Sequence, residues 1–297
     1  MNSPLFTGSG VALVTPFTHD TVDLPALGRL LDFQLDHHTD AVIICGTTGE
    51  ASTMTYGEQL RVIEYAVEHV GGRVPVIAGS GSNSTENAIA MSRDAQRAGA
   101  DGLLVVTPYY NKATQPGLIR HYRAIADAIH IPLILYNVPS RTGVSIAPET
   151  CRTLAEHPNI AGIKEASGDL AHIQQIRNLC PEDFALWSGN DDQVVPICAL
   201  GGSGVISVAA NVAPELMHRL VQLCLNNDFA VAGKLQLELK PLCDALFCEV
   251  NPIPVKTALA LMGWNVGPLR LPLCSPTPEH LTRIQTTLEA YHLLPNS

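Results

Sequence analysis

The sequence predicts a (β/α)8 TIM barrel followed by a C-terminal helical extension, and three observations predict it. Short apolar runs alternate with longer segments of helical periodicity up to residue 226. The runs are apolar throughout, which is typical of parallel strands that are buried on both faces. Eight such runs occur, and eight is the number of strands that closes this kind of barrel.

The predicted strands are rich in β-branched and other apolar residues, and several of them run into glycine or polar residues. They cover residues 11–15, 41–45, 74–78, 103–107, 133–137, 160–164, 184–188 and 204–208. A doubly wound sheet is the alternative architecture. It is disfavoured because the units are evenly spaced and no Gly-x-Gly-x-x-Gly follows the first strand.

Amphipathic helices are predicted after each strand, since apolar residues recur there at three- and four-residue spacing. Leu60, Ile63, Val67 and Val70 show this pattern. The predicted helices cover residues 24–37, 56–70, 85–98, 117–129, 148–157, 170–179, 193–200 and 214–225.

Strand patterns stop at about residue 230, and the remaining segments have helical patterns at 230–247, 254–262 and 278–292. We therefore predict a catalytic barrel over residues 1–226 and a helical extension over 227–297 that packs on the barrel. The extension is too short to be expected as an independent domain.

Charge and composition exclude several classes of function. The net charge is −10, with Lys+Arg 18 against Asp+Glu 28 and no basic run, so a nucleic-acid partner is not expected. No apolar stretch is long enough to span a membrane, and residues 1–10 lack the pattern of a signal peptide. The 8 cysteines form no C-x-x-C pair and the histidines form no ligand motif. Reduced, buried thiols, no metal site and a cytoplasmic location are therefore expected.

Lys164 ends the sixth predicted strand, where side chains of this fold face the mouth of the barrel. Loss of solvation there favours the neutral amine, which can attack a ketone and form an imine. Taken alone, a lysine at this place serves as often to pair with a carboxylate or a phosphate. Tyr136 ends the fifth strand, and its hydroxyl could shuttle protons beside an imine. A structural tyrosine is the favoured interpretation of Tyr136 in isolation.

Two loops add groups that can bind carboxylates. Thr47 and Thr48 lie in the Gly-Thr-Thr-Gly-Glu loop after the second strand, which offers backbone N–H groups and hydroxyls. Arg141 follows the fifth strand in a turn-like stretch, and its planar guanidinium suits a carboxylate. Each signal alone fits an ordinary turn or a solvated arginine. Together with an amine and a phenol, these groups suit a small 2-oxo acid and a second anionic substrate.

These motifs resemble the dihydrodipicolinate synthase family of pyruvate aldolases, in the same order and over nearly the whole chain. N-acetylneuraminate lyases and 2-keto-3-deoxygluconate aldolases share the lysine and a Gly-x-Thr-Gly-Glu loop, but generally lack Tyr-Tyr-Asn and Ser-Arg-Thr-Gly. The matching segments are residues 46–50, 108–111, 136–143, 162–165, 204–207 and 251–256.

The resemblance implies a lyase of lysine and diaminopimelate biosynthesis that works through a Schiff base and needs no cofactor. Lys164 condenses with pyruvate, and Tyr136 gives and takes protons. Thr47 links Tyr136 to Tyr110, which reaches in from a neighbouring subunit. A homotetramer built from two tight dimers is implied.

Substrate binding is also implied by the resemblance. Thr48 and the main chain at Ile206 hold the carboxylate of pyruvate, and Arg141 receives the carboxylate of L-aspartate-4-semialdehyde. The enamine of pyruvate adds to that aldehyde, and the adduct cyclises to 4-hydroxy-tetrahydrodipicolinate.

The sequence departs from the family at a regulatory site, where lysine-inhibited members commonly carry histidines and a glutamate. The corresponding positions here are Tyr56, Gln59 and Asn87, whereas Asn83 and Tyr109 match. Loss of the glutamate removes a partner for the lysine ammonium, so weak or absent feedback by lysine is expected.

Three other functions are less favoured by the sequence. An aldolase for sugar acids is disfavoured by Arg141, because a neutral polyol acceptor gives it no carboxylate. A non-catalytic binding protein is disfavoured because Lys164, Tyr136, Thr47 and Tyr110 are all present. A nicotinamide or flavin barrel is the most distant alternative.

Overall fold

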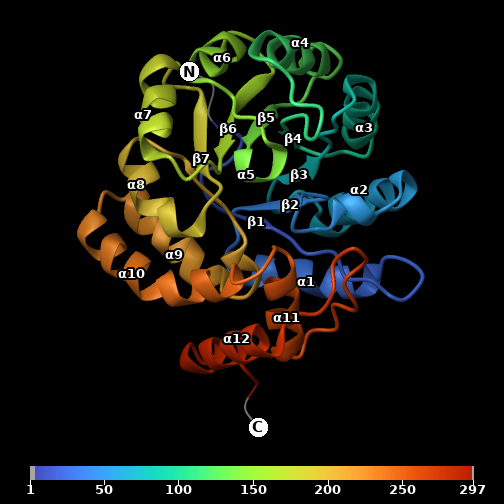
Figure 1. Cartoon of the computed structure of the whole chain (residues 1–297), viewed down its shortest axis with the longest axis vertical. Coiled ribbons are helices and arrows are strands. Elements are labelled where there is room, and N and C mark those ends of the chain that lie inside the picture. Colours follow the sequence, from blue (N-terminus) through green and yellow to red (C-terminus); the bar gives the residue numbers. More distant parts are fainter. Residues whose placement is uncertain (1–3, 296–297) are drawn as a thin grey trace.

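Eight parallel strands close into a barrel in which each strand pairs with the next along the chain and the last pairs with the first (Figure 1). This computed structural model describes residues 4–295. Residues 1–3, part of the stretch without a signal-peptide pattern, lie outside that range. The predicted TIM barrel is confirmed.

Seven of the predicted strands overlap the observed ones with ends that differ by two residues at most. The strands are β1 (Gly8–Ala12), β2 (Ala41–Ile44), β3 (Val76–Gly79), β4 (Gly102–Val106), β5 (Leu133–Asn137), β6 (Ile160–Glu165), β7 (Ala185–Ser188) and β8 (Gly204–Ser207).

The prediction for β1 was wrong by three residues at each end. Its glycines suggest a turn, yet they lie inside the strand. A side chain at Gly10 would lie 2.8 Å from Ile43 and 2.9 Å from Phe6, so glycine is needed where these larger side chains fill the barrel. Thr15 therefore lies in the loop after the strand rather than at its end.

The helices surround the barrel as predicted, and one short helix, α5, was missed. The helices of the barrel are α1 (Leu24–Asp36), α2 (Tyr56–Val70), α3 (Thr85–Arg97), α4 (Gln115–Ala126), α5 (Pro139–Thr142), α6 (Pro148–Ala155), α7 (Leu170–Leu179), α8 (Val194–Ala199) and α9 (Pro214–Leu225). Helix α4 begins two residues before its predicted start because Thr114 caps it, accepting from the Gly117 N–H.

Two apolar layers hold the barrel together. One fills its interior, where Phe6 stacks on Trp187 with ring centroids 5.1 Å apart. The other lies between the strands and the helices and includes residues of nearly every helix. The interior layer is a packed core, so substrates have access only at the ends of the barrel.

The extension consists of α10 (Phe229–Leu246), α11 (Ile253–Leu261) and α12 (Pro278–Ala290). Helix α10 packs on α8 and α9, and α12 packs on α10 and α11 (Figure 1). The segment between α10 and α11 lines a cavity at the barrel mouth. The extension thus contributes to that cavity as well as covering the barrel.

The cysteines are all free, and 6 of the 8 are buried, as predicted. Within residues 4–295, no helix is both long and apolar enough to cross a membrane.

Candidate active site

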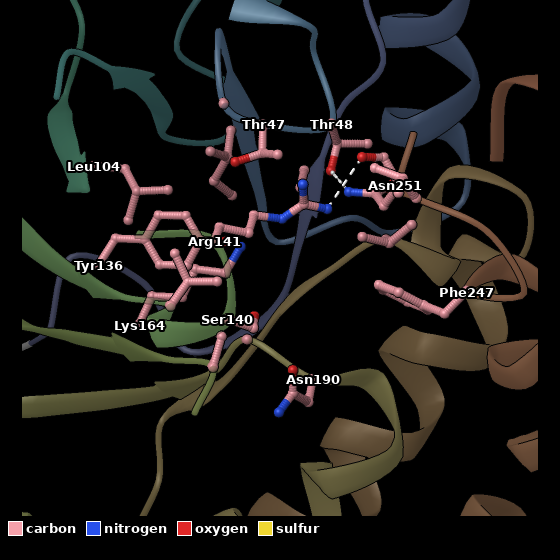
Figure 2. Close-up of a pocket in the computed structure, with 18 of the residues that line it drawn as sticks. Thr47, Thr48, Leu104, Tyr136, Ser140, Arg141, Lys164, Asn190, Phe247 and Asn251 are labelled. Carbon is pink, nitrogen blue, oxygen red and sulfur yellow. Dashed lines mark hydrogen bonds between the residues drawn. The ribbon is translucent and has the colours of Figure 1, made fainter. Parts of the chain in front are cut away.

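A cavity of about 370 Å³ opens at the C-terminal ends of the strands (Figure 2). Its walls come mainly from β2, β5 and β6, from the loops after β2, β5, β6 and β7, and from the segment between α10 and α11. The residues that line it include Thr47, Thr48, Tyr136, Arg141, Lys164, Asn190, Phe247, Glu249 and Asn251. Five of the predicted site residues therefore meet in one cavity.

Lys164 and Tyr136 lie side by side because β5 and β6 pair with these two residues in register. The Lys164 Nζ lies 4.5 Å from the centroid of the Tyr136 ring (Figure 2). Lys164 is 5% exposed and Tyr136 8% exposed, so both are largely shielded from bulk water. An amine held in this way can form an imine beside a phenol that exchanges protons.

Gly189, at the end of β7, makes room for the lysine. A side chain there would lie 3.1 Å from Cε of Lys164 and 2.6 Å from Cβ of Ala166. A larger residue would therefore clash with Ala166 and force the lysine stem to shift slightly.

The loop after β2 places its two threonines on the cavity wall. The Thr48 Oγ1 accepts a hydrogen bond of 3.0 Å from the Asn251 side-chain amide. Thr47 is held by the main chain, since its carbonyl accepts from the Glu50 N–H at 3.1 Å. Within residues 4–295, no hydrogen bond joins the Thr47 and Tyr136 hydroxyls. A single chain therefore does not complete the link from Tyr136 through Thr47 to Tyr110 that the resemblance implies.

Arg141 lies in α5 rather than in the expected turn, and Pro139 begins that helix. Its Nη2 donates to the main-chain carbonyl of Asn251 at 3.1 Å. Figure 2 shows its guanidinium crossing the cavity toward Thr48 and Asn251. Asn251 thus orients both side chains that were predicted to bind carboxylates.

Ile206 differs from the other predicted residues, because its side chain is fully buried in the barrel interior. The chain just after it is held by Asp191, which accepts from the Val208 and Ala209 N–H groups at 3.1 Å and 2.9 Å. Burial raises the pKa of Asp191, and these hydrogen bonds oppose that shift.

Tyr110 does not reach the cavity. Its side chain is 90% exposed, and its backbone has a φ of 71°, in the left-handed region. Sequence reasoning placed this tyrosine in a neighbouring subunit's site, and a single chain leaves that prediction open.

Asn251 and Asp191 are site residues whose roles were missed. Asn251 lies in one of the segments that resemble the family, but no periodicity in the sequence shows that a residue of the extension reaches the mouth of the barrel. Asp191 follows β7 and is 3% exposed. The sequence shows an acid after a predicted strand, but it does not show that this acid is buried. Within residues 4–295, no group of three or more His, Cys, Asp or Glu could hold a metal ion.

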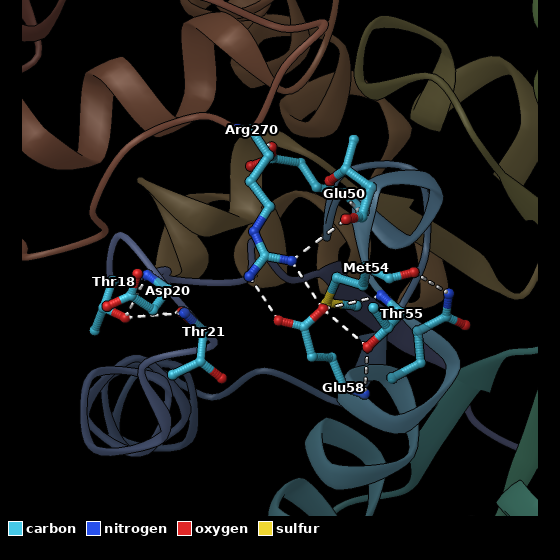
Figure 3. Close-up of polar contacts among 10 residues, drawn as sticks. Thr18, Asp20, Thr21, Glu50, Met54, Thr55, Glu58 and Arg270 are labelled. Atoms are coloured by element: carbon cyan, nitrogen blue, oxygen red, sulfur yellow. Dashed lines mark hydrogen bonds and ion pairs between the residues drawn. The ribbon is translucent and has the colours of Figure 1, made fainter.

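An ion pair fastens the extension to α2 next to the site (Figure 3). Arg270 binds both carboxylate oxygens of Glu58, at 2.9 Å and 2.6 Å. Glu58 also accepts from the Thr55 N–H at 2.9 Å, which completes a capping box at the start of α2. The hydrogen bond from Arg270 lowers the pKa of Glu58 to about 2, against a smaller opposing effect of burial.

Glu58→Gln is expected to destabilise the protein at neutral pH but not in acid. The pKa of Glu58 is lower in the folded chain than in the unfolded one, so its pairing stabilises above the unfolded pKa, about 4.3. That contribution is lost as pH falls from there toward the folded pKa of about 2. The side chains of Arg270 and Glu58 are 20% and 14% exposed. A pair still partly open to solvent contributes about 1 kcal/mol, or roughly 2 °C in Tm. Melting curves of both proteins from pH 7 down to the folded pKa of about 2 would check this, and a gap that does not narrow with falling pH would contradict it.

The family model described as the dihydrodipicolinate synthetase family matches residues 5–291. The chain belongs to this family. It is 54% identical over 292 residues to a 4-hydroxy-tetrahydrodipicolinate synthase of Thermoanaerobacter sp. (strain X514), covering 98% of each chain. The family that the motifs resemble is thereby confirmed.

Solved structures agree with this assignment. The dihydrodipicolinate synthase of Aquifex aeolicus is 45% identical, with a TM-score of 0.96 over 98% of this chain and 100% of its own. A chloride-inhibited dihydrodipicolinate synthase of Acinetobacter baumannii, solved in complex with pyruvate, is 42% identical, with a TM-score of 0.95 over 97% of this chain and 99% of its own.

Proposed function

We propose that this protein condenses pyruvate with L-aspartate-4-semialdehyde to give 4-hydroxy-tetrahydrodipicolinate, on the route to diaminopimelate and lysine. The observation that carries the proposal is the buried Lys164 amine beside the Tyr136 ring in a cavity that Arg141 also lines. The relatives named as synthases of this product, which align along the whole chain, support it.

The first half of the reaction makes the nucleophile. The Lys164 Nζ adds to the keto carbon of pyruvate, and the carbinolamine loses water to form an imine. Tyr136 gives the proton that the departing hydroxyl takes up and recovers one from the amine. Loss of a proton from the pyruvate methyl group then gives the enamine, because the protonated imine accepts the electron pair.

The second half joins the two substrates. The enamine carbon adds to the aldehyde carbon, and the aldehyde oxygen takes up a proton to become the 4-hydroxyl. The amino group of the adduct then attacks the imine carbon and closes the ring. The Lys164 amine leaves in that step and returns to its starting state.

Two sets of groups hold the substrates in this proposal. The Thr48 hydroxyl and the main chain at Ile206 bind the pyruvate carboxylate at the base of the cavity. Arg141 binds the semialdehyde carboxylate nearer its opening. Thr47 completes a proton path to Tyr110 of a second subunit.

The proton path to Tyr110 of a second subunit requires that the protein forms oligomers. The 90% exposure of Tyr110 in one chain supports a site that a neighbouring subunit completes. We propose a homotetramer of two tight dimers. The free thiols support a place in the reducing cytoplasm.

Pyruvate-dependent consumption of three aldehydes by the purified protein tests the proposed reaction. L-Aspartate-4-semialdehyde should be consumed, whereas N-acetylmannosamine and glyceraldehyde should not. A preference for either sugar aldehyde would keep the Schiff-base chemistry but reject the role of Arg141 and the pathway. Failure to trap any pyruvate adduct with borohydride would reject the enzyme altogether and favour a binding protein.

Feedback by lysine is expected to be weak or absent. Tyr56, Gln59, Asn87 and Tyr109 line one pocket of about 300 Å³. The Tyr56 hydroxyl donates to Asp94 at 2.5 Å, and Asn87 offers no charge to a lysine ammonium. Activity should stay nearly constant with lysine at millimolar concentration. Strong inhibition that Asn87→Ala relieves would contradict this.

A further inference from the structure

The Gly-Thr-Thr-Gly-Glu loop ends in a buried carboxylate. Glu50 is 1% exposed and has a φ of 54°, in the left-handed region that residues with a side chain rarely adopt. Its N–H donates to the Thr47 carbonyl, so the turn that carries Thr47 and Thr48 closes at Glu50. Whatever holds the carboxylate of Glu50 therefore also holds this turn.

The groups that bind this carboxylate come from the extension. The Lys256 Nζ, on α11, donates to Glu50 Oε1 at 2.7 Å. The Arg270 main-chain N–H donates to Oε2 at 3.0 Å, and Figure 3 shows Arg270 next to Glu50. Lys256 itself is 2% exposed. Its ammonium also donates to the Pro268 carbonyl at 2.9 Å and lies 4.4 Å from the centroid of the Phe17 ring. The contacts with Pro268 and Phe17 thus hold the lysine in place in addition to its bond with Glu50.

A buried carboxylate cannot keep its charge without such partners, because its desolvation is costly. Without the Lys256 ammonium, Glu50 would have to turn toward water or take up a proton. Either change alters the turn that Glu50 closes. Thr47 and Thr48 lie two or three residues away. Among the described residues, the Asn251 amide is the one further side-chain link from Thr48 to the extension.

We propose that Lys256 is a positioning residue of the reaction, which acts through Glu50 to set the place of the Thr47 and Thr48 hydroxyls. Lys256 is outside the set of residues that line the cavity, and it does not touch the reacting atoms. Its effect should therefore fall on pyruvate binding and imine formation. The inference rests on the proposed function, because it takes the loop as the cradle of the pyruvate carboxylate.

Three variants of the full-length protein test this role. Lys256→Met keeps the length of the side chain but leaves the Glu50 carboxylate without its cation, with only the hydrogen bond from the Arg270 main-chain N–H among the contacts described above. The double variant Glu50→Gln with Lys256→Met leaves no unpaired charge in the interior. Glu58→Gln is the matched control, since it breaks the ion pair of the Arg270 side chain but removes neither the Lys256 ammonium nor the Arg270 main-chain N–H that bind Glu50. The readouts are Tm, kcat, the KM for pyruvate and the rate at which borohydride traps the pyruvate adduct.

Lys256→Met should raise the KM for pyruvate and slow trapping, each by about 10- to 100-fold, because small misplacements of binding groups have effects of that size. The double variant should regain thermal stability while its KM stays raised, which separates positioning from folding. If Lys256→Met does not fold, the double variant still tests the proposal. Glu58→Gln should keep the KM of the wild type.

Two results would overturn the positioning role. One is a double variant that binds pyruvate like the wild type. The other is a KM that rises equally in Glu58→Gln, since the effect would then come from general loosening of the extension. If the wild type itself traps no pyruvate adduct, the proposed function fails first, and that outcome is separate from both.

Discussion

Replacing Lys164 by alanine should lower activity by about 10³-fold or more and abolish the pyruvate adduct, because removal of a catalytic nucleophile has effects of this size. No other lysine lines the cavity among the described residues, so no second amine can take its place. The stability of the variant should change little, since alanine leaves space at the barrel mouth rather than a buried charge. Mass spectrometry after treatment with pyruvate and borohydride would measure the loss directly.

Lys234→Ala is the matched control for that experiment, because Lys234 is an exposed lysine on α10, away from the cavity. It should retain both the adduct and full turnover. An adduct that survives in Lys164→Ala would place the Schiff base on a different lysine, and peptide mapping of the trapped protein would identify it.

The second large effect is expected for Arg141→Lys. The change keeps the positive charge but loses the planar pair of donors that matches a carboxylate. Arg141 is exposed in the free chain. A hydrogen bond to a charged group contributes about 1.5–3 kcal/mol, so kcat/KM for L-aspartate-4-semialdehyde should fall by roughly 10- to 150-fold. Formation of the pyruvate adduct should be nearly unchanged, because it precedes the binding of the second substrate.

Adduct formation with pyruvate and the later addition of the semialdehyde can be measured separately. Steady-state kinetics with each substrate varied, together with borohydride trapping, separates them. Arg61→Lys, an exposed arginine on α2, should behave like the wild type. If Arg141→Lys lost the adduct as well, Arg141 would have to serve pyruvate, and the assignment of the two carboxylate sites would be reversed.

Much of the barrel could be predicted from the sequence because apolar runs and helical periodicity are local properties. The predicted span 133–137 coincides with β5, and the register of β5 with β6 then brings Tyr136 next to Lys164. The first strand was the exception. Gly10 is required by Phe6 and Ile43 inside the closed barrel, and Gly8 by the side chain of Asp40, so both requirements come from packing between segments rather than from local sequence.

The groups that support the site were harder to predict, because they depend on contacts between distant parts of the chain. Asn251 and Thr48 are 203 positions apart, and Lys256 and Glu50 are 206 positions apart. No local pattern indicates such pairs. The position of Arg141 in the short helix α5 was missed for a related reason, since four residues are too few to show helical periodicity.

The contacts of the extension have a consequence for the order in which the protein becomes active during its synthesis. Lys164 and Tyr136 leave the ribosome well before Asn251, Lys256 and Arg270, which hold the loop after β2. Until those last residues arrive, Glu50 has neither of its partners from the extension, and the cavity lacks one wall. A nascent chain, or a product of premature termination, would thus carry its nucleophile without a finished site around it.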